Sequence, residues 1–262
     1  MISTKKLFPI NPQKDLISQQ LAYAVSLVFH PLMLPTLFLG MMFFTAPPEV
    51  MNLDHTFRWS FLGIIFIMTF IFPICITAIV LLSRKPQTTS KPGEVSDHLI
   101  DEFFQAFPEE RKKSSKDELD LDLQMHTIQD RKVVFSLVTV IYIIATVLFK
   151  LRTFKLIPEL SVILICITAS LFVLTFITFY WKISAHGVAM GGLLGILFAF
   201  SQQYGNGVLM YQIIATVILA GVVMTARLYL DAHKPDQIFA GMLMGFEVNY
   251  LILLFFLKII RI

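Results

Sequence analysis

The chain has 262 residues, of which 56% are hydrophobic and only 15% are charged, and its mean hydropathy is +0.74. This composition excludes an ordinary water-soluble domain and indicates a multi-pass membrane protein. The net charge is only +3 and most charged residues lie in one loop of mixed sign, which argues against a nucleic-acid partner. The two cysteines, Cys75 and Cys166, fall inside apolar runs and make no disulfide framework.

Seven apolar stretches are candidates for crossing a bilayer, which takes about 20 residues in a helix. In chain order they are residues 21–44, 59–82, 133–149, 156–180, 185–200, 207–225 and 238–257. Backbone groups in lipid must be satisfied within the segment, and no alternating strand pattern is present. We therefore expect an all-α polytopic membrane bundle of about seven helices, with a kink in the first helix at His30-Pro31 and Pro35.

One hydrophilic segment, residues 83–132, separates the first two apolar stretches from the last five. It divides the chain into residues 1–82, the charged loop and a membrane core at 133–262. The loop has two interpretations: a solvated, poorly ordered segment, or one that includes an amphipathic surface helix. The second rests on apolar residues at helical spacing, namely Leu99, Ile100, Phe103, Phe104 and Phe107.

Two short polar turns carry cations beside histidines at the ends of apolar stretches. They are Lys182-Ile183-Ser184-Ala185-His186 and Arg227-Leu228-Tyr229-Leu230-Asp231-Ala232-His233. Seven crossings would place both turns on one membrane face, together with the charged loop. Phosphoryl transfer needs fixed positive charge, a nucleophile and a proton donor for the leaving oxygen, and the two turns supply all three.

These turns resemble motifs of the type 2 phosphatidic acid phosphatase superfamily, membrane lipid phosphatases whose helical core is shared with vanadium haloperoxidases. That family carries Pro-Ser-Gly-His and, further on, Ser-Arg, five residues, His, three residues and Asp. Here Ile183-Ser184-Ala185-His186 is similar to the first motif. Ala226-Arg227, five residues, then His233-Lys234-Pro235-Asp236-Gln237 is similar to the second. The resemblance covers roughly residues 131–245, and His-x-Pro-x-Gln with Lys-Ile-Ser-x-His looks like a bacterial subgroup.

The resemblance implies a role for each matching residue and requires no cofactor. In the family one histidine attacks phosphorus to form a phosphohistidine, and another protonates the leaving oxygen. Carried over, His233 is the nucleophile and His186 is the acid. Phosphate binding would fall to Arg131, Lys182, Ser184 and Arg227.

This sequence departs from the family at two places. The first motif, a lysine, six residues and Arg-Pro, is absent: Arg131 is the best candidate for its arginine, with Gln124 and Lys132 at the lysine and proline positions. Gln237 stands where the family has the aspartate that orients the nucleophile, and Asp236 lies one residue earlier. A glutamine can fix the tautomer of a histidine but does not stabilise an imidazolium as a carboxylate does.

Other polar residues and glycines in the last helices carry further expectations. Glu247 lies nine residues into the last stretch, roughly 14 Å deep at about 1.5 Å per residue. It has two readings: a proton- or ion-coupling group, or a carboxyl hydrogen-bonded inside the bundle, which we expect. Gly191, Gly192 and Gly195 predict close helix packing. No histidine and carboxylate cluster has metal-ligand spacing, so no metal is expected.

Most of the 21 Lys and Arg residues fall on the face that carries both histidine turns, which by the positive-inside rule is cytoplasmic. Relatives in the family commonly work on the outer face, so the side stays open. We expect a bacterial cytoplasmic-membrane phosphatase or phosphotransferase acting on a lipid phosphate monoester or polyprenyl pyrophosphate. The alternatives are a degenerate, non-catalytic member that binds lipid or partners, and a transporter that uses Glu247.

Overall fold

A computed structural model describes residues 12–48, 50, 54–83, 128–153, 158–205 and 207–260. Every regular element among these residues is a helix. Six continuous helical runs among them are long and apolar enough to cross a membrane. The first run joins α3 (His55–Phe66), η2 (Ile67–Ile71) and α4 (Phe72–Ser83). The others are α7 (Ile128–Thr153), α8 (Pro158–Thr178), α9 (Ala185–Tyr204), α10 (Met210–Tyr229) and α11 (Pro235–Ile260). The all-α membrane architecture expected from composition is thus confirmed.

The first predicted stretch is two helices, α1 (Pro12–Val28) and α2 (Leu34–Thr45), where we expected one kinked helix. The break falls at residues 29–33. Pro31 supplies no backbone N–H, and its ring disfavours helical geometry at His30. Pro35 is tolerated because it lies in the first turn of α2, where the N–H would have no partner in the helix. The break therefore leaves His30 on a short non-helical segment.

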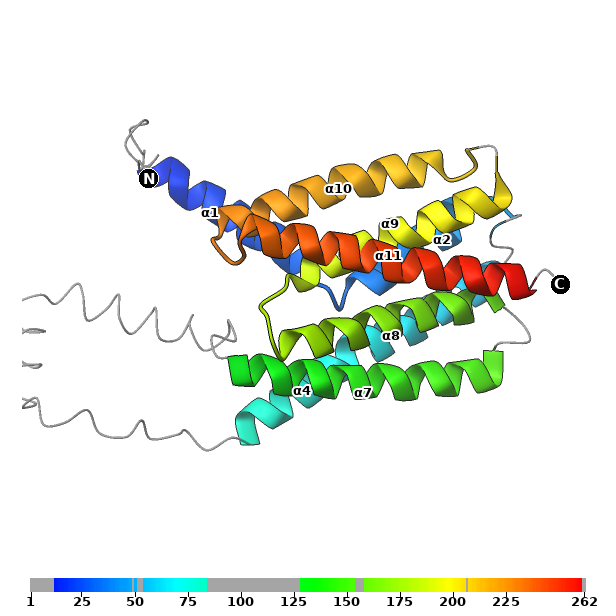
Figure 1. Cartoon of the computed structure of the whole chain (residues 1–262), viewed down its shortest axis with the longest axis horizontal. Coiled ribbons are helices and arrows are strands. Elements are labelled where there is room, and N and C mark those ends of the chain that lie inside the picture. The colour runs from blue at the N-terminus through cyan, green and yellow to red at the C-terminus, as the bar shows by residue number, and fades with distance from the viewer. Residues whose placement is uncertain are drawn as a thin grey trace, which may run out of the picture.

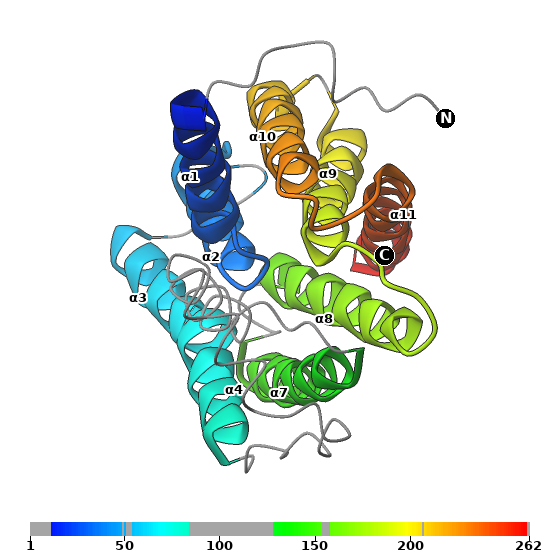
Figure 2. The same ribbon diagram turned by 90° about the vertical axis from the view of Figure 1, so that its left-hand side faces the viewer.

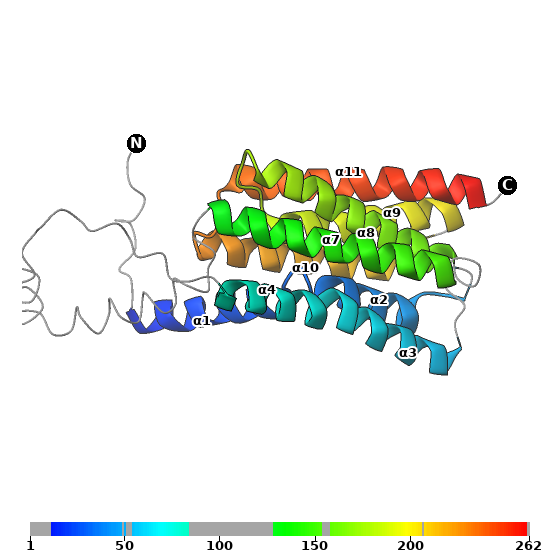
Figure 3. The same cartoon turned by 90° about the horizontal axis from the view of Figure 1, so that it is seen from below.

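The helices run nearly along one axis, and both polar turns lie at the same end of the bundle. Figures 1 and 3 show that α7, α9 and α11 begin, and α4, α8 and α10 end, at the end where α1 begins. We call this the histidine end, and it carries residues 179–184 and 230–234. Seen from that end, α9 lies between α10 and α11, and α1 lies beside α10 (Figure 2).

Helices α9 and α11 pack backbone against backbone. A Cβ added to Gly187 would lie 2.8 Å from the carbonyl oxygen of Ile238, and one added to Gly241 would lie 2.8 Å from the carbonyl oxygen of Ser184. Further along, a Cβ on Gly191 would collide with the carbonyl of Met242. Small residues at four-residue spacing let membrane helices approach this closely. The close helix packing predicted at Gly191 is thus confirmed, and the glycines fix how α11 lies on α9.

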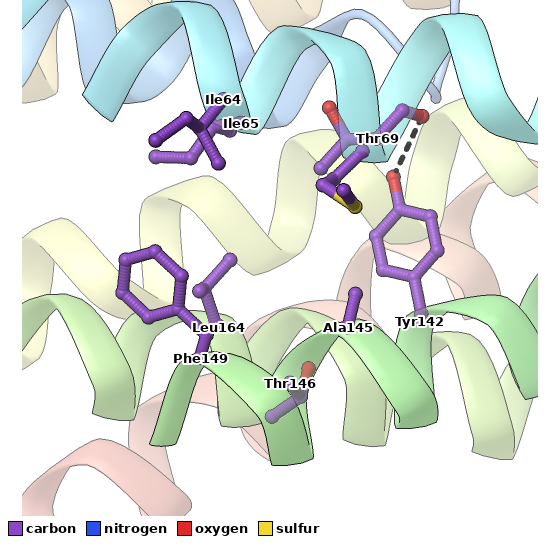
Figure 4. Close-up of a pocket in the computed structure, with 9 residues that line it drawn as sticks. Ile64, Ile65, Thr69, Tyr142, Ala145, Thr146, Phe149 and Leu164 are labelled. Carbon is purple, nitrogen blue, oxygen red and sulfur yellow. Dashed lines mark hydrogen bonds between the residues drawn. The ribbon is translucent and has the colours of Figure 1, made fainter. Parts of the chain in front are cut away.

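Hydroxyl groups link the other helices across the bundle. Thr139 and Thr175 join α7 to α8 through their Oγ1 atoms at 2.6 Å, and Tyr142 donates to the carbonyl oxygen of Thr69 at 3.1 Å. Thr69 lies in the π-helical turn η2, and a small apolar cavity opens beside it (Figure 4). The lining residues are Ile64, Ile65, Met68, Thr69, Tyr142, Ala145, Thr146, Phe149 and Leu164. None of them belongs to the polar turns.

The amphipathic helix considered for residues 99–107 and the position of Gln124 lie outside the described residues.

The glycine contact predicts that Gly191→Ala destabilises the protein, because its new methyl group has to displace the backbone of α11. We expect a loss of about 1–3 kcal/mol, the usual cost of overpacking, measured by thermal unfolding in detergent. Gly221→Ala is the matched control: it lies in the middle of α10, and an added Cβ meets nothing within 4 Å. Equal unfolding temperatures for the two variants would contradict the packing argument.

Candidate active site at the histidine end

His233 lies in the turn between α10 and α11 and faces Gln237, in the first turn of α11. Its Nδ1 is 3.2 Å from Oε1 of Gln237, and the backbone N–H of Lys234 donates to the same Oε1 at 3.2 Å. Because a backbone N–H can only donate, the shared atom has to be the amide oxygen. His233 therefore carries a proton on Nδ1, and in the neutral ring the lone pair is on Nε2. Gln237 also caps α11 by satisfying the N–H of Lys234.

The second turn is joined to the first through the backbone. The N–H of Ser184 donates to the carbonyl oxygen of Gln237 at 3.3 Å, and the hydroxyl of Ser184 accepts the N–H of Gly187 at 3.3 Å. Ser184 is the N-cap of α9 and is fully buried. Its observed role is therefore to cap α9 and hold the two turns together, and the structure gives it no exposed surface for the phosphate contact expected from the sequence.

His186 lies in the first turn of α9 and is oriented by α1. Its Nε2 is 3.2 Å from the carbonyl oxygen of Ser26, which can only accept, so Nε2 carries the proton and Nδ1 is the second titratable nitrogen. His186 is buried, and His233 lies close enough to act on it electrostatically. Each histidine thus has one ring nitrogen oriented by an oxygen, Nδ1 of His233 by Gln237 and Nε2 of His186 by Ser26.

Arg227, in the last turn of α10, supplies positive charge to this cluster. It lies close enough for its charge to act on the imidazoles of both His30 and His186. The rings of His30 and His186 meet edge to face with centroids 6.0 Å apart. Three histidines and an arginine from the α1–α2 break, α9, α10 and the turn before α11 therefore gather at one place.

The remaining predicted cations lie at the same end of the bundle. Lys182 is exposed in the turn before α9. Arg131 is in the first turn of α7. Phe135, one helical turn later, packs against the cluster that contains Ile183, a residue of the turn before α9. Lys132 lies over the ring of Phe179 at 5.4 Å from the centroid. Asp236 is exposed beside Gln237, and the glutamine is the residue that holds His233.

Sequence reasoning missed two members of the cluster, Ser26 and His30. His30 carried a signal, because a histidine before a proline in an apolar run marks a break where polar backbone and side chains can gather. Ser26 carried none, because it acts through its backbone carbonyl, which every residue has. Both belong to the segment before residue 131, outside the stretch that carries the two histidine turns.

The expectation that Glu247 is hydrogen-bonded inside the bundle is wrong. Its side chain is exposed on α11, in line with Leu243 and Leu251, which are 47% and 62% exposed. The buried polar residue of α11 is Asn249, whose amide donates to Ser170 Oγ and to the carbonyl oxygen of Gly245, both at 2.6 Å. A helix turns by about 100° per residue, so two positions separate the inner face from the outer face.

Among the described residues no group of three or more His, Cys, Asp or Glu side chains is placed to hold a metal ion. No family model, curated protein or solved structure matches the chain. The chemistry therefore has to be argued from the cluster itself. It offers two imidazoles with fixed orientations, of His233 and His186, and the guanidinium of Arg227, all at one end of a helical bundle.

The shared oxygen of Gln237 predicts distinct outcomes for two substitutions. Gln237→Leu removes the acceptor for two N–H groups and should cost about 1–2 kcal/mol in thermal unfolding. Gln237→Glu keeps an acceptor in place and should unfold close to wild type. In ¹⁵N NMR of histidine-labelled protein, the Nδ1–H tautomer of His233 should dominate in wild type and mix with the other tautomer in the leucine variant. An unchanged tautomer in Gln237→Leu would contradict the assignment.

Proposed function

We propose that the chain is an integral-membrane phosphatase or phosphotransferase that cleaves a lipid phosphate monoester or pyrophosphate through a phosphohistidine. The observation that carries the proposal is the contact of His233 Nδ1 with the Gln237 oxygen that also accepts the Lys234 N–H. Gln237 and the Lys234 N–H together require a proton on Nδ1, which leaves the Nε2 lone pair for attack on phosphorus. A histidine nucleophile needs such a lone pair and an oriented ring. The motif resemblance supports the same assignment.

In the first step His233 Nε2 attacks phosphorus, the P–N bond forms and the bond to the leaving oxygen breaks. For this step His186 has to be doubly protonated, with the second proton on Nδ1 taken up when the dianionic phosphate binds; it delivers that proton to the leaving oxygen and becomes neutral, while its Nε2–H stays on the carbonyl of Ser26. Arg227 stabilises the charge on the non-bridging phosphate oxygens, for which a planar guanidinium is well suited. Lys182 and Arg131 add positive charge at the same end of the bundle.

In the second step water attacks the phosphohistidine, the P–N bond breaks and phosphate leaves. His186, now neutral, takes the proton of the attacking water on Nδ1, which restores its starting state. An alcohol in place of water would make the protein a phosphotransferase. Neither step uses a metal ion.

The fold supports the proposal of a lipid substrate, since a phosphate at the histidine end would lie at the bilayer surface with the lipid chains alongside the apolar helices. We count α1 and α2 as one broken crossing, because together they run the length of the bundle (Figure 3). Seven crossings then put α1's start and both polar turns on one face. By charge that face is cytoplasmic, in a bacterial cytoplasmic membrane.

The transporter alternative loses its main support, because the side chain of Glu247 is exposed on α11 and does not face the inside of the bundle. The degenerate, non-catalytic alternative differs from the proposed enzyme only in lacking the reaction: such a protein would bind a lipid phosphate without cleaving it. Turnover is therefore the measurement that separates it from the proposed enzyme.

The test is phosphate release by the purified full chain in detergent, with EDTA present, from phosphatidic acid, phosphatidylglycerol phosphate and polyprenyl pyrophosphate. We expect turnover of at least one lipid, and a loss of about a thousandfold or more in His233→Ala, since a nucleophile is removed. Glu247→Gln is the control and should retain wild-type turnover. Folded wild-type protein that releases no phosphate, or full activity in His233→Ala, would reject the proposed function.

A further inference from the structure

We infer that His30, in the break between α1 and α2, is a further anion-binding residue of this site and donates its Nε2–H to a phosphate oxygen. The inference rests on the proposed function for the identity of the substrate. The anion site itself does not depend on turnover, because a phosphate-like ion can be bound without being cleaved.

The proton on His30 is placed by the backbone. The N–H of Leu32 donates to Nδ1 of His30 at 3.3 Å. Since a backbone N–H can only donate, Nδ1 has to be the acceptor, and the neutral ring carries its proton on Nε2. No hydrogen bond within the described residues engages that Nε2–H. His30 therefore presents a donor, the group that a phosphate oxygen requires.

The position of His30 is set by its neighbours. Its ring lies edge to face with that of His186, with centroids 6.0 Å apart, and the charge of Arg227 acts on both rings. An anion held by Arg227 next to His186 is therefore next to His30 as well. Ser26, one helical turn earlier in α1, holds the other side of His186. Residues 26–30 thus form a wall of the site.

The break in the helix is what makes this wall polar. Had α1 continued through residues 29–33, its N–H groups would have been used within the helix. Instead the Leu32 N–H turns back to His30, and the chain resumes as a helix at Leu34. Irregular backbone at membrane depth is tolerated where it is buried in protein or lines a polar site. The break at His30 meets that condition beside two other histidines.

A purely structural role for His30 is the competing account, in which its only task is to accept the Leu32 N–H. Two isosteric variants separate the accounts. An asparagine places an acceptor near the position of Nδ1, whereas a glutamine extends an N–H donor toward the position of Nε2. If His30 is purely structural, His30→Asn should restore the anion binding that is lost in His30→Ala. If His30 binds the anion, His30→Gln should restore it.

The experiment uses the full chain in detergent and orthovanadate, an analogue of a phosphoryl group in transfer, as the probe. Vanadate binding is measured by its effect on thermal unfolding, and KM and kcat are measured with the best lipid of the panel. A hydrogen bond to a charged group is commonly worth tenfold or more in affinity. We expect His30→Ala to weaken vanadate binding and raise KM by about tenfold, with a smaller change in kcat, and His30→Gln to recover most of the loss.

His55→Ala is the matched control, because His55 is an exposed histidine at the start of α3, beside Trp59. Wild-type vanadate affinity in His30→Ala, or rescue by asparagine and not by glutamine, overturns the inference. If His233→Ala abolishes turnover while His30→Ala behaves as wild type, the enzyme assignment stands and the role of His30 falls. If vanadate binding needs His30 but no lipid is cleaved, the anion site stands and the proposed function falls.

Discussion

The contact between the backbones of α9 and α11 is the constraint on which the site depends. Gly187 follows His186 directly, and Gly241 lies one turn after Gln237, so the close contact of the two helices begins next to both histidine turns and tightens one turn further along, at Gly191 and Gly245. With no side chain between them, the Ser184 N–H reaches the carbonyl of Gln237. The two histidines are therefore placed by main-chain packing, and neither has to contact the other. Every other member of the cluster is arranged around this fixed pair.

A glutamine in place of a carboxylate changes the chemistry of that pair in one respect and preserves it in another. The amide oxygen of Gln237 fixes the tautomer of His233 and caps α11 at the same time. It offers no negative charge to stabilise a positively charged phosphohistidine ring, as an aspartate would. The first step should therefore depend more on Arg227 and on other positive charge around the phosphate. In the proposed reaction, the orientation of His233 is retained, while electrostatic assistance to it as the nucleophile is reduced.

The sequence predicted the six later helices well because each is an apolar run of about membrane length with turn or polar residues at its ends. It also predicted that Gly191 and its neighbours pack closely, because small residues in an apolar helix leave few other uses for their positions. It misplaced Glu247, since periodicity within a largely apolar helix does not tell which side faces the protein. It did not predict Ser26, whose contribution is a carbonyl oxygen, nor that the break at Pro31 would bring His30 to His186.

The site includes residues of α1 and of the break that follows it, in addition to the two histidine turns. Motif resemblance covers roughly residues 131–245 and supplies His186, Arg227 and His233, all on helices that pack directly on one another. The orientation of His186 nevertheless comes from the carbonyl of Ser26, and the third histidine comes from the break that follows. A main-chain acceptor and a proline-enforced break tolerate many side-chain changes elsewhere in α1. Such a wall can therefore be built from a segment with little sequence signature, which is why short motifs alone describe only part of the site.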